Sequence, residues 1–319
     1  MLKIGNLRLN SRLILAPMSG ISDLPFRLLN RKFGAELAFV EMINVRSLGY
    51  NSRKTSQMLS TNKEDKPLGV QILGCEQDYI LRALDILKSY KYDILDFNAA
   101  CPVKKVTRRG EGASLLKDPL KLQRLLKLVV ENSRVPVTVK IRIGWDKNSI
   151  NAREVALYAQ GAGASALFIH GRTKTQGYGG EVDYRVIRQV KKSLDIPVIA
   201  SGNVFSAGLA EKMFDETGCD AVLVARGALG NPWFFRKAKE LPQADEVARA
   251  MLEHLDSCID FYGARNAVSI FHKFFGWYSR GFRKIRRLRE KAYRAKTRQE
   301  MCRVIEEFRG YKRVGQKAG

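Results

Sequence analysis

The sequence has few cysteines and no long apolar run. Its 319 residues include five cysteines, an odd number, and no two of them form a Cys-x-x-Cys pair. This usage fits free thiols in a reducing compartment and argues against a disulfide framework or a zinc site. No stretch approaches about 18 uninterrupted apolar residues, and polar residues interrupt the N-terminal segment before any apolar run of secretory length. We therefore expect a soluble cytoplasmic protein with no membrane span, no signal peptide and no bound metal.

Acidic residues are also scarce. The chain has 32 Asp and Glu against 56 Lys and Arg, which gives a formal net charge of +24. The electric field of such a charge attracts polyanions over a Debye length of about 10 Å. Residues 280–298 alone hold ten basic residues and a single acidic one, Glu290, for a local net charge of +9. This concentration favours a face that binds a polyanion over a basic surface that is merely solvated.

Short apolar or β-branched runs recur along the first three quarters of the chain, at 12–17, 37–43, 68–73, 93–98, 136–142, 165–170, 196–201 and 220–226. Helical segments lie between them, with start signals at Ser22-Asp23, Asp118-Pro119 and Ser206. Continuous apolar strands that alternate with helices are buried on both faces and hence parallel. Eight such units over about 235 residues predict a (β/α)₈ TIM barrel.

The pattern changes after Leu241-Pro242. No further strand-like run follows, and the remaining segments are helical in composition. We therefore predict a TIM-barrel catalytic domain over residues 1–240 and a small all-helical, basic domain over residues 243–319. Within the second domain, residues 311–319 are expected to form a frayed tail.

Catalysis and ligand binding in a TIM barrel occupy the loops at the C-terminal ends of the strands. Seven of the eight predicted strand ends carry polar or reactive residues, which are Pro17-Met18-Ser19, Gln71, Asn98 with Cys101, Lys140 with Arg142, His170 with Arg172, Ser201-Gly202-Asn203, and Arg226-Gly227. The last two loops often form a phosphate site in such barrels, because their glycines allow close backbone approach. Ordinary strand-to-helix turns carry the same glycines, so both interpretations stay open.

Three residues at these ends have a chemical interpretation beside a structural one. Cys101 lies at the barrel mouth, and a thiol with an ordinary pKa of about 8.5 is mostly protonated at neutral pH, which suits a general acid or a latent nucleophile. A buried small hydrophobe is the alternative. Lys140 lies within an apolar strand, where an ammonium is costly unless it meets an anion or reacts. His170 ends an apolar strand, and a core histidine is its alternative.

Together these residues closely resemble the tRNA-dihydrouridine synthases, flavin enzymes that reduce uridine in transfer RNA. The resemblance spans nearly the whole chain, through APMSGISDLPFR at 16–27, GVQILG at 69–74, DFNAACPVKKVTRRGEGASLL at 96–116, PVTVKIRIGWD at 136–146, IHGRTKTQGYGG at 169–180, IPVIASGNV at 196–204, ARGALGNPWFF at 225–235 and FHKFFGWYSRGF at 271–282. Three positions depart from the family pattern: Ala100 and Ala225 stand where glycine is common, and Ser201-Gly202-Asn203 stands where Asn-Gly-Asp is frequent.

The resemblance implies a tightly bound FMN at the barrel mouth, NADPH as reductant, hydride transfer from the flavin to C6 of the uracil, and Cys101 as the proton donor to C5. It implies that the flavin and the uracil contact the strand-end residues. Pro17 and Met18 would pack against the flavin, Gln71, Lys140 and His170 would bond to its ring, and its phosphate would be held by Gly202, Asn203, Arg226 and Gly227. The flipped uracil would lie near Asn98, Lys140 and Arg172.

A uridine must leave the RNA stack to reach such a flavin, at a cost of a few kcal/mol that contacts to phosphates must offset. We expect these contacts from the loop after the fourth strand and from a helix over 280–298, through Lys104, Lys105, Arg108, Arg109, Arg283, Lys284, Arg286 and Arg287. We expect tRNA as the partner of a monomeric protein. Three alternatives stay open: a flavin barrel that acts on a free pyrimidine, as dihydroorotate dehydrogenases do; Schiff-base aldol chemistry at Lys140; and a non-catalytic RNA-binding module.

Overall fold

The computed structural model describes residues 1–49, 53–236 and 241–314. They divide into two compact units. The first, called here the barrel unit, comprises Met1–Asp23 and Ala35–Arg226, and the second, the helical unit, comprises Leu24–Gly34 and the chain from Gly227 on. Helix α1 (Leu24–Lys32) therefore belongs with the C-terminal helices. The domain limits predicted at residues 240 and 243 stay a prediction, and residue 240 lies outside the described residues.

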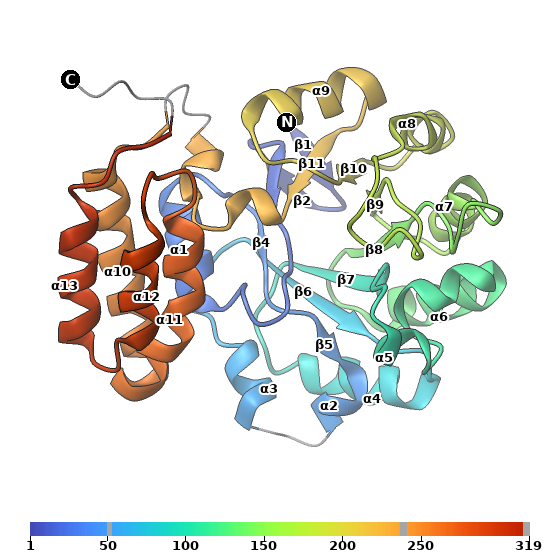
Figure 1. Ribbon diagram of the computed structural model, residues 1–319. Helices are drawn as coiled ribbons and strands as arrows, with labels where there is room; N and C mark the ends of the chain where they lie inside the picture. The colour runs from blue at the N-terminus through green and yellow to red at the C-terminus, as the bar shows by residue number, and fades with distance from the viewer. Residues whose placement is uncertain (50–52, 237–240, 315–319) are drawn as a thin grey trace. The chain divides into compact units, whose positions relative to one another are not determined.

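The barrel unit contains a closed sheet of parallel strands (Figure 1), which are β3 (Leu13–Leu15), β4 (Ala38–Phe39), β6 (Leu68–Leu73), β7 (Ile94–Ala99), β8 (Val137–Arg142), β9 (Ala166–His170), β10 (Val198–Ser201) and β11 (Ala221–Val224). Their order is β4-β3-β11-β10-β9-β8-β7-β6, and β4 pairs again with β6, so the sheet closes on itself. The predicted eight-stranded TIM barrel is confirmed.

One predicted strand is interrupted. The run 37–43 forms β4 and a separate short strand, β5 (Ile43–Asn44), which pairs with the C-terminal end of β6. The residues between them turn toward the barrel mouth: the Glu41 carboxylate accepts a hydrogen bond from the backbone N–H of Gly20, and the Met42 sulfur contacts the amide of Asn98 at 3.1 Å. The break therefore brings polar and polarisable groups to the mouth.

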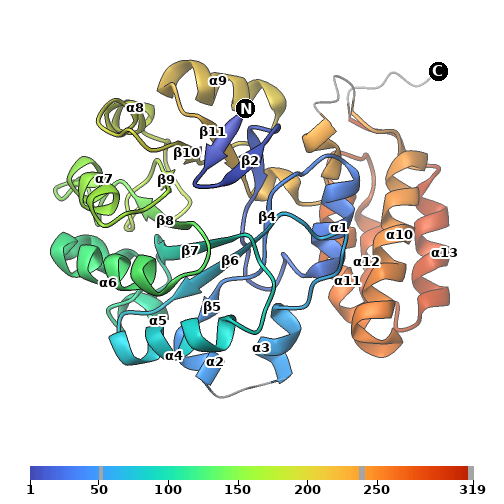
Figure 2. The ribbon, with the colours of Figure 1, turned by 180° about the vertical axis from the view of Figure 1, so that it is seen from behind.

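A hairpin that the sequence analysis did not predict closes the opposite end of the barrel. Strands β1 (Leu2–Ile4) and β2 (Leu7–Leu9) pair antiparallel, and Leu2, Ile4 and Leu9 are buried. They belong to one apolar cluster with residues at the beginnings of barrel strands, including Ile94 and Ala166. The hairpin lies at the N-terminal ends of the strands (Figure 2), where its apolar side chains join the barrel core.

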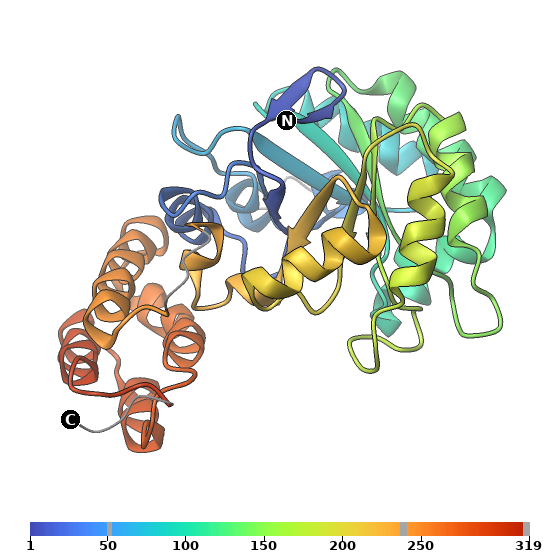
Figure 3. The same cartoon turned by 90° about the horizontal axis from the view of Figure 1, so that it is seen from above.

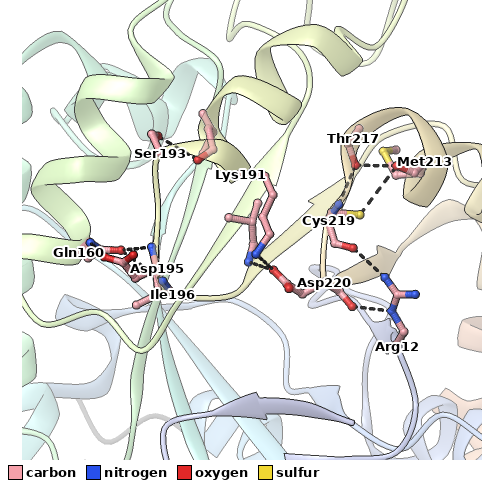
Figure 4. A network of polar contacts seen from close by, with 12 residues as sticks. Arg12, Gln160, Lys191, Ser193, Asp195, Ile196, Met213, Thr217, Cys219 and Asp220 are labelled. Atoms are coloured by element: carbon pink, nitrogen blue, oxygen red, sulfur yellow. Dashed lines mark hydrogen bonds and ion pairs between the residues drawn. The ribbon is translucent and has the colours of Figure 1, made fainter.

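Polar residues at this closed end are structural (Figure 4). Arg12 donates hydrogen bonds to the carbonyls of Cys219 at 2.8 Å and Asp220 at 2.7 Å, just before β11. The Asp220 carboxylate accepts from the backbone N–H of Val198 at 2.7 Å and pairs with Lys191 at 2.7 Å. The first and last strands of the barrel are thus joined through side chains as well as through the sheet.

Helices surround the barrel strands and are, in chain order, α2 (Val45–Gly49), α3 (Arg53–Met58), α4 (Gln77–Leu87), α5 (Lys104–Thr107), α6 (Pro119–Asn132), α7 (Ala152–Gly161), α8 (Tyr184–Lys192) and α9 (Ala207–Thr217). A 3₁₀ helix, η1 (Gly112–Lys117), precedes α6. The Asp118 side chain accepts from Lys121 N at 2.9 Å, and Ser206 accepts from Leu209 N at 3.3 Å. These predicted N-caps are confirmed.

The helical unit packs α1 with α10 (Ala244–Tyr262), α11 (Ala264–Tyr278), α12 (Arg286–Arg294) and α13 (Arg298–Phe308), as Figure 3 shows for the C-terminal helices. The 3₁₀ helices η2 (Arg226–Ala228) and η3 (Pro232–Arg236) lead into it. His254 is fully buried among aromatic rings, with the ring centroid of Phe274 at 4.3 Å and that of Phe271 at 5.7 Å. None of the helices in the described ranges is both long and apolar enough to span a membrane.

The basic segment 280–298 is not one helix, contrary to expectation. Helix α12 covers only its middle, the extended Ala295 ends that helix, and a capping box between Thr297 and Glu300 begins α13. Before α12, residues 281–285 form turns in which Lys284 has a left-handed φ of +53°.

The chain end is also more ordered than expected. Arg283 N donates to Lys312 O at 3.0 Å, and Val314 N donates to Gly281 O at 2.8 Å. Residues 311–314 are therefore held against the turns before α12 and do not fray, whereas residues 315–319 lie outside the described part of the chain.

Candidate active site

The predicted site residues of the fourth to sixth barrel strands lie side by side at the open end. In the sheet register, Asn98 on β7 pairs with Lys140 on β8, and Arg142 pairs with His170 on β9. Because all three strands are parallel, their C-terminal ends reach the same rim. The structure thus brings residues from positions 98 to 170 into one site.

A chain of hydrogen bonds runs beneath this rim. The Thr138 hydroxyl donates to Oδ1 of Asp96 at 2.7 Å, and Nε2 of Gln71 donates to Oδ2 of the same carboxylate at 2.7 Å. Oε1 of Gln71 then accepts from Nδ2 of Asn98 at 2.8 Å. All four side chains are buried. The chain links β6, β7 and β8 and ends at the loop that carries Cys101.

The backbone around Cys101 is held from three sides. Oδ1 of Asn98 accepts from the N–H groups of Ala100 and Cys101, both at 2.9 Å. Arg142 Nε donates to the Ala100 carbonyl at 2.8 Å, and Ala113 N donates to the Cys101 carbonyl at 3.1 Å. Gly112 fits beneath because an added Cβ would lie 2.8 Å from the Cys101 carbonyl oxygen. The loop therefore presents the thiol in a fixed position.

The Cys101 thiol stays protonated at neutral pH. Its side chain is partly buried, and burial raises its pKa above the ordinary value. The hydrogen bond from the Val103 backbone and the charges of Arg142 and Lys140 act in the opposite direction without reversing the shift. A protonated thiol at a barrel mouth can act as a general acid.

No described residue forms an ion pair with the ammonium of Lys140. Within residues 1–49, 53–236 and 241–314 its ammonium has no hydrogen bond or ion pair, and its side chain is only partly exposed. Burial, followed by the charge of Arg142, lowers the pKa of Lys140 to about 8, while Asp96 and Cys101 act to raise it. The group is still mostly protonated at pH 7. A partly buried cation without a partner favours an anionic ligand.

Asp96 and His170 have shifted pKa values as well. Burial raises the pKa of Asp96 to about 6, against hydrogen bonds from Thr138 and Gln71 and the charge of Lys140, which lower it. Burial lowers the pKa of His170 well below its ordinary value, and the cations around it add to the shift. His170 is therefore neutral at pH 7, and Asp96 is mostly ionised.

Arg172 and Arg142 hold the loop that follows β9. Arg172 Nη2 donates to the Gly180 carbonyl at 2.6 Å, and its Nη1 lies 3.3 Å from Nε2 of His170. Arg142 Nη1 donates to the Gly177 carbonyl at 2.8 Å. Both guanidinium groups are thus committed to the loop, and the placement of Arg172 near a substrate base stays a prediction.

Three of the predicted phosphate-binding residues, Gly202, Asn203 and Arg226, follow the C-terminal ends of β10 and β11. Nη2 of the exposed Arg226 donates to Oδ1 of Asn203 at 3.1 Å. Gly202 has φ of +132°, and an added Cβ would lie 2.7 Å from Val182 and 3.2 Å from the His170 ring. Asn203 itself has a left-handed φ of +52°. Gly227 follows Arg226 in the chain and is buried. Both residues after β10 therefore have a positive φ, and at Gly202 the packing of Val182 leaves no room for a side chain.

Pro17 and Met18 end the first barrel strand and are partly buried, and Met18 packs against the apolar cluster of the barrel. The Met18 backbone N–H donates to the Ser22 hydroxyl at 2.9 Å, which fixes the turn that follows β3. Their predicted contact with a flavin ring stays a prediction.

All eight predicted RNA-binding residues are exposed: Lys104, Lys105, Arg108, Arg109, Arg283, Lys284, Arg286 and Arg287. The first four lie on α5 and the turn after it, within eight residues of Cys101. In the helical unit, Arg286 pairs with Glu290 at 3.2 Å. These positions leave the cationic groups available to solvent or to phosphates.

Sequence reasoning missed three residues of this site. Asp96 and Thr138 are polar residues within otherwise apolar strands, a signal that the sequence did contain. Tyr178 had no such signal, because it lies in a glycine-rich loop. Its exposed ring lies 6.3 Å from the His170 ring and 5.3 Å from the Arg226 guanidinium.

Among the described residues, no group of three His, Cys, Asp or Glu is placed to hold a metal ion.

The C-terminal ends of the barrel strands carry a protonated thiol, an ammonium without an ion-pair partner among the described residues, and a turn with glycine and arginine. This arrangement is typical of TIM-barrel enzymes, whose active sites lie at these strand ends. The family model described as dihydrouridine synthase (Dus) matches residues 14–312, so the chain belongs to the dihydrouridine synthase family.

Relatives of known name are similar over most of their length. The tRNA-dihydrouridine synthase B of Pasteurella multocida is 39% identical over 289 residues, covering 88% of this chain and 87% of that protein. The tRNA-dihydrouridine synthase B of Pseudomonas aeruginosa is 38% identical over 315 residues, covering 96% and 95%. Histamine dehydrogenase from Rhizobium sp. 4-9 has a similar fold, with a TM-score of 0.57 and 11% identity over 80% of this chain and 50% of that one.

Proposed function

We propose that this protein reduces uridine to 5,6-dihydrouridine in tRNA, with FMN as bound cofactor and NADPH as reductant. Family membership and the names of the relatives support an oxidoreductase that acts on tRNA. The net charge of +24 suits a polyanionic substrate. The observation that carries the proposal is the fixed, protonated Cys101 thiol beside the unpaired ammonium of Lys140.

The residues at the mouth fit FMN. Its reduced ring is anionic near N1 and the C2 oxygen, and the lone ammonium of Lys140 matches that charge. Its phosphate suits the turn formed by Gly202, Asn203 and Arg226, where the first two residues have a positive φ and the Arg226 guanidinium is exposed. Neutral His170 and the second hydrogen of Gln71 Nε2 would complete the contacts to the ring. When bound, FMN supplies the hydride for C6 of the uracil, after reduction by NADPH.

Cys101 supplies the other half of the reduction. Hydride addition at C6 leaves negative charge on the base, and the Cys101 Sγ–H gives its proton to C5, so that a hydride and a proton together saturate the double bond. Because burial raises the pKa of Cys101, the thiol keeps its proton until that charge develops. The thiolate is then reprotonated from water. Asn98 holds the Cys101 backbone throughout.

The exposed basic residues would bring the RNA to the mouth. Extrusion of a uridine from folded RNA costs a few kcal/mol, and contacts from Lys and Arg to phosphates offset that cost. Lys104, Lys105, Arg108 and Arg109 follow Cys101 directly and would contact the backbone near the reacting base. The basic residues of the helical unit would bind the tRNA elsewhere.

Replacement of the thiol tests the proposal. Cys101→Ala should retain FMN and oxidise NADPH normally, but form dihydrouridine at least about 100-fold more slowly, the usual contribution of a general acid. Cys219→Ala, at the closed end of the barrel, is the matched control and should behave as the wild type. Unimpaired product formation by Cys101→Ala would remove the thiol from the mechanism. Equal turnover of free uridine and tRNA would support the free-pyrimidine alternative instead.

A further inference from the structure

The hydrogen-bond chain beneath Cys101 has a fixed direction at both of its ends. At the upper end, the backbone groups of Ala100 and Cys101 can only donate, so the atom of Asn98 that faces them must be Oδ1. At the lower end, an ionised Asp96 can only accept, so the atom of Gln71 that faces it must be Nε2. Between these ends the two amides can satisfy each other in one orientation only, with Asn98 Nδ2 donating to Gln71 Oε1.

An amide by itself has no preferred orientation in such a chain. If Gln71 rotated by 180° about its last bond, its Nε2 would face Asn98 Nδ2, and two donors would oppose each other. Asn98 would not follow, because the N–H groups of Ala100 and Cys101 require its Oδ1. Its Nδ2 would lose the Gln71 acceptor and keep the Met42 sulfur at 3.1 Å. A mismatch at the base of the chain therefore weakens the support of Asn98, the residue that holds the thiol-bearing loop.

We infer that Asp96 is a positioning residue for Cys101, because its carboxylate sets the direction of the Gln71 amide, which in turn supports the Asn98 amide that fixes the thiol-bearing loop. The inference rests on the proposed role of Cys101 as proton donor. Asp96 lies inside the barrel, accepts from Thr138 and Gln71, and touches neither the backbone of Cys101 nor its thiol. Its effect on the reaction is therefore indirect.

Two substitutions of Asp96 distinguish the effect of its hydrogen-bond acceptors on the Gln71 amide from the effect of its negative charge. Asp96→Leu removes every acceptor and leaves the Gln71 amide free to rotate. Asp96→Asn keeps an acceptor oxygen for Gln71, since its Nδ2 can turn to the Thr138 oxygen. Asp93→Asn is the matched control, because Asp93 precedes the same strand and accepts from Leu68 N at 2.7 Å outside the chain.

The two half-reactions of the FMN-loaded protein are measured separately. Reduction of the flavin by NADPH needs no thiol, but Gln71 also contacts the flavin ring in the proposed site, so the reoxidation rate of each variant is compared with its own reduction rate. Reoxidation by tRNA should slow at least about tenfold in Asp96→Leu, the lower end of the usual effect of a supporting residue, and stay within about threefold in Asp96→Asn. Wild-type reoxidation by Asp96→Leu, or equal slowing in Asp96→Leu and Asp96→Asn, would overturn the inference.

Moving the carboxylate from position 96 to position 98 tests the same hydrogen-bond chain through protein stability, without any enzymatic reaction. Asn98→Asp alone places acceptors at both ends of Gln71, so it should lower the free energy of unfolding. The double variant Asp96→Asn with Asn98→Asp reverses both hydrogen bonds of Gln71, while the backbone N–H groups and the Thr138 hydroxyl still donate as before. It conserves the net charge and should be more stable than Asn98→Asp alone. Additive effects of the two substitutions would refute a directed chain. This measurement stays valid if the Cys101→Ala experiment disproves the proposed function, so the two failures are distinguishable.

Discussion

Replacement of Lys140 by Met should stabilise the ligand-free protein while abolishing its flavin binding. The pKa of Lys140 falls from 10.5 to about 8 in the folded state, mainly through burial. At 1.36 kcal/mol for each pKa unit, the charge costs at most about 3 kcal/mol at pH 7. Because the side chain is partly exposed, solvent reduces this cost, and we expect a gain of about 2 kcal/mol. Methionine keeps the apolar length of the side chain.

The pH dependence has a defined sign. Between pH 8 and 10.5, an unfolded chain still binds the proton of Lys140 and the folded protein does not, so wild-type stability rises with pH through this interval. Lys140→Met lacks this titration. Its advantage over the wild type should therefore be largest below pH 8 and about half as large at pH 9.5.

Unfolding of the ligand-free protein in guanidinium chloride at pH 7 and pH 9.5 measures both quantities. Lys147→Met is the matched control, because the Lys147 side chain is exposed and its substitution should change the free energy of unfolding little. If Lys140→Met were less stable than the wild type at pH 7, the predicted cost of burying the ammonium would be refuted. The ammonium would then stabilise the ligand-free fold.

Two further predictions concern the helical unit. Burial lowers the pKa of His254 to about 3, so protonation of the unfolded chain should cost the wild type about 2 kcal/mol of stability between pH 7 and pH 5. His254→Phe should lack this loss, and identical pH slopes in unfolding experiments followed by tryptophan fluorescence would contradict the prediction. Simultaneous replacement of Arg283, Lys284, Arg286 and Arg287 by Ala should weaken tRNA binding and flatten its dependence on salt, without any change in flavin content. Lys3→Ala with Arg8→Ala, on the hairpin at the closed end, is the control; unchanged tRNA affinity of the fourfold variant would count against the assigned RNA contacts.

The residues that could be predicted from sequence are those whose signal is local. Asp118 and Ser206 cap helices because their side chains reach the third residue onward, and this spacing is visible in the chain itself. Cys101, Lys140 and His170 stood out because each is a polar or reactive residue at a strand end or within an apolar strand. The basic segment 280–298 was recognised by composition, but its division into turns and two helices depended on contacts with residues 312–314 that composition does not contain.

The sequence by itself determined the barrel, because eight buried parallel strands require eight apolar runs, and each run is a property of neighbouring residues. The motifs at the strand ends carried the resemblance to the family. Only the tertiary structure decided how the Cys101 loop is held and why the Lys140 ammonium has no ion-pair partner among the described residues. Gln71 and Asp96 are 25 residues apart and Thr138 is a further 42 residues from Asp96, so their hydrogen bonds exist only once the strands have paired. The same closure partly buries Lys140 where no described residue pairs with it. The sequence states which side chains are charged, but their desolvation depends on the residues that fold around them.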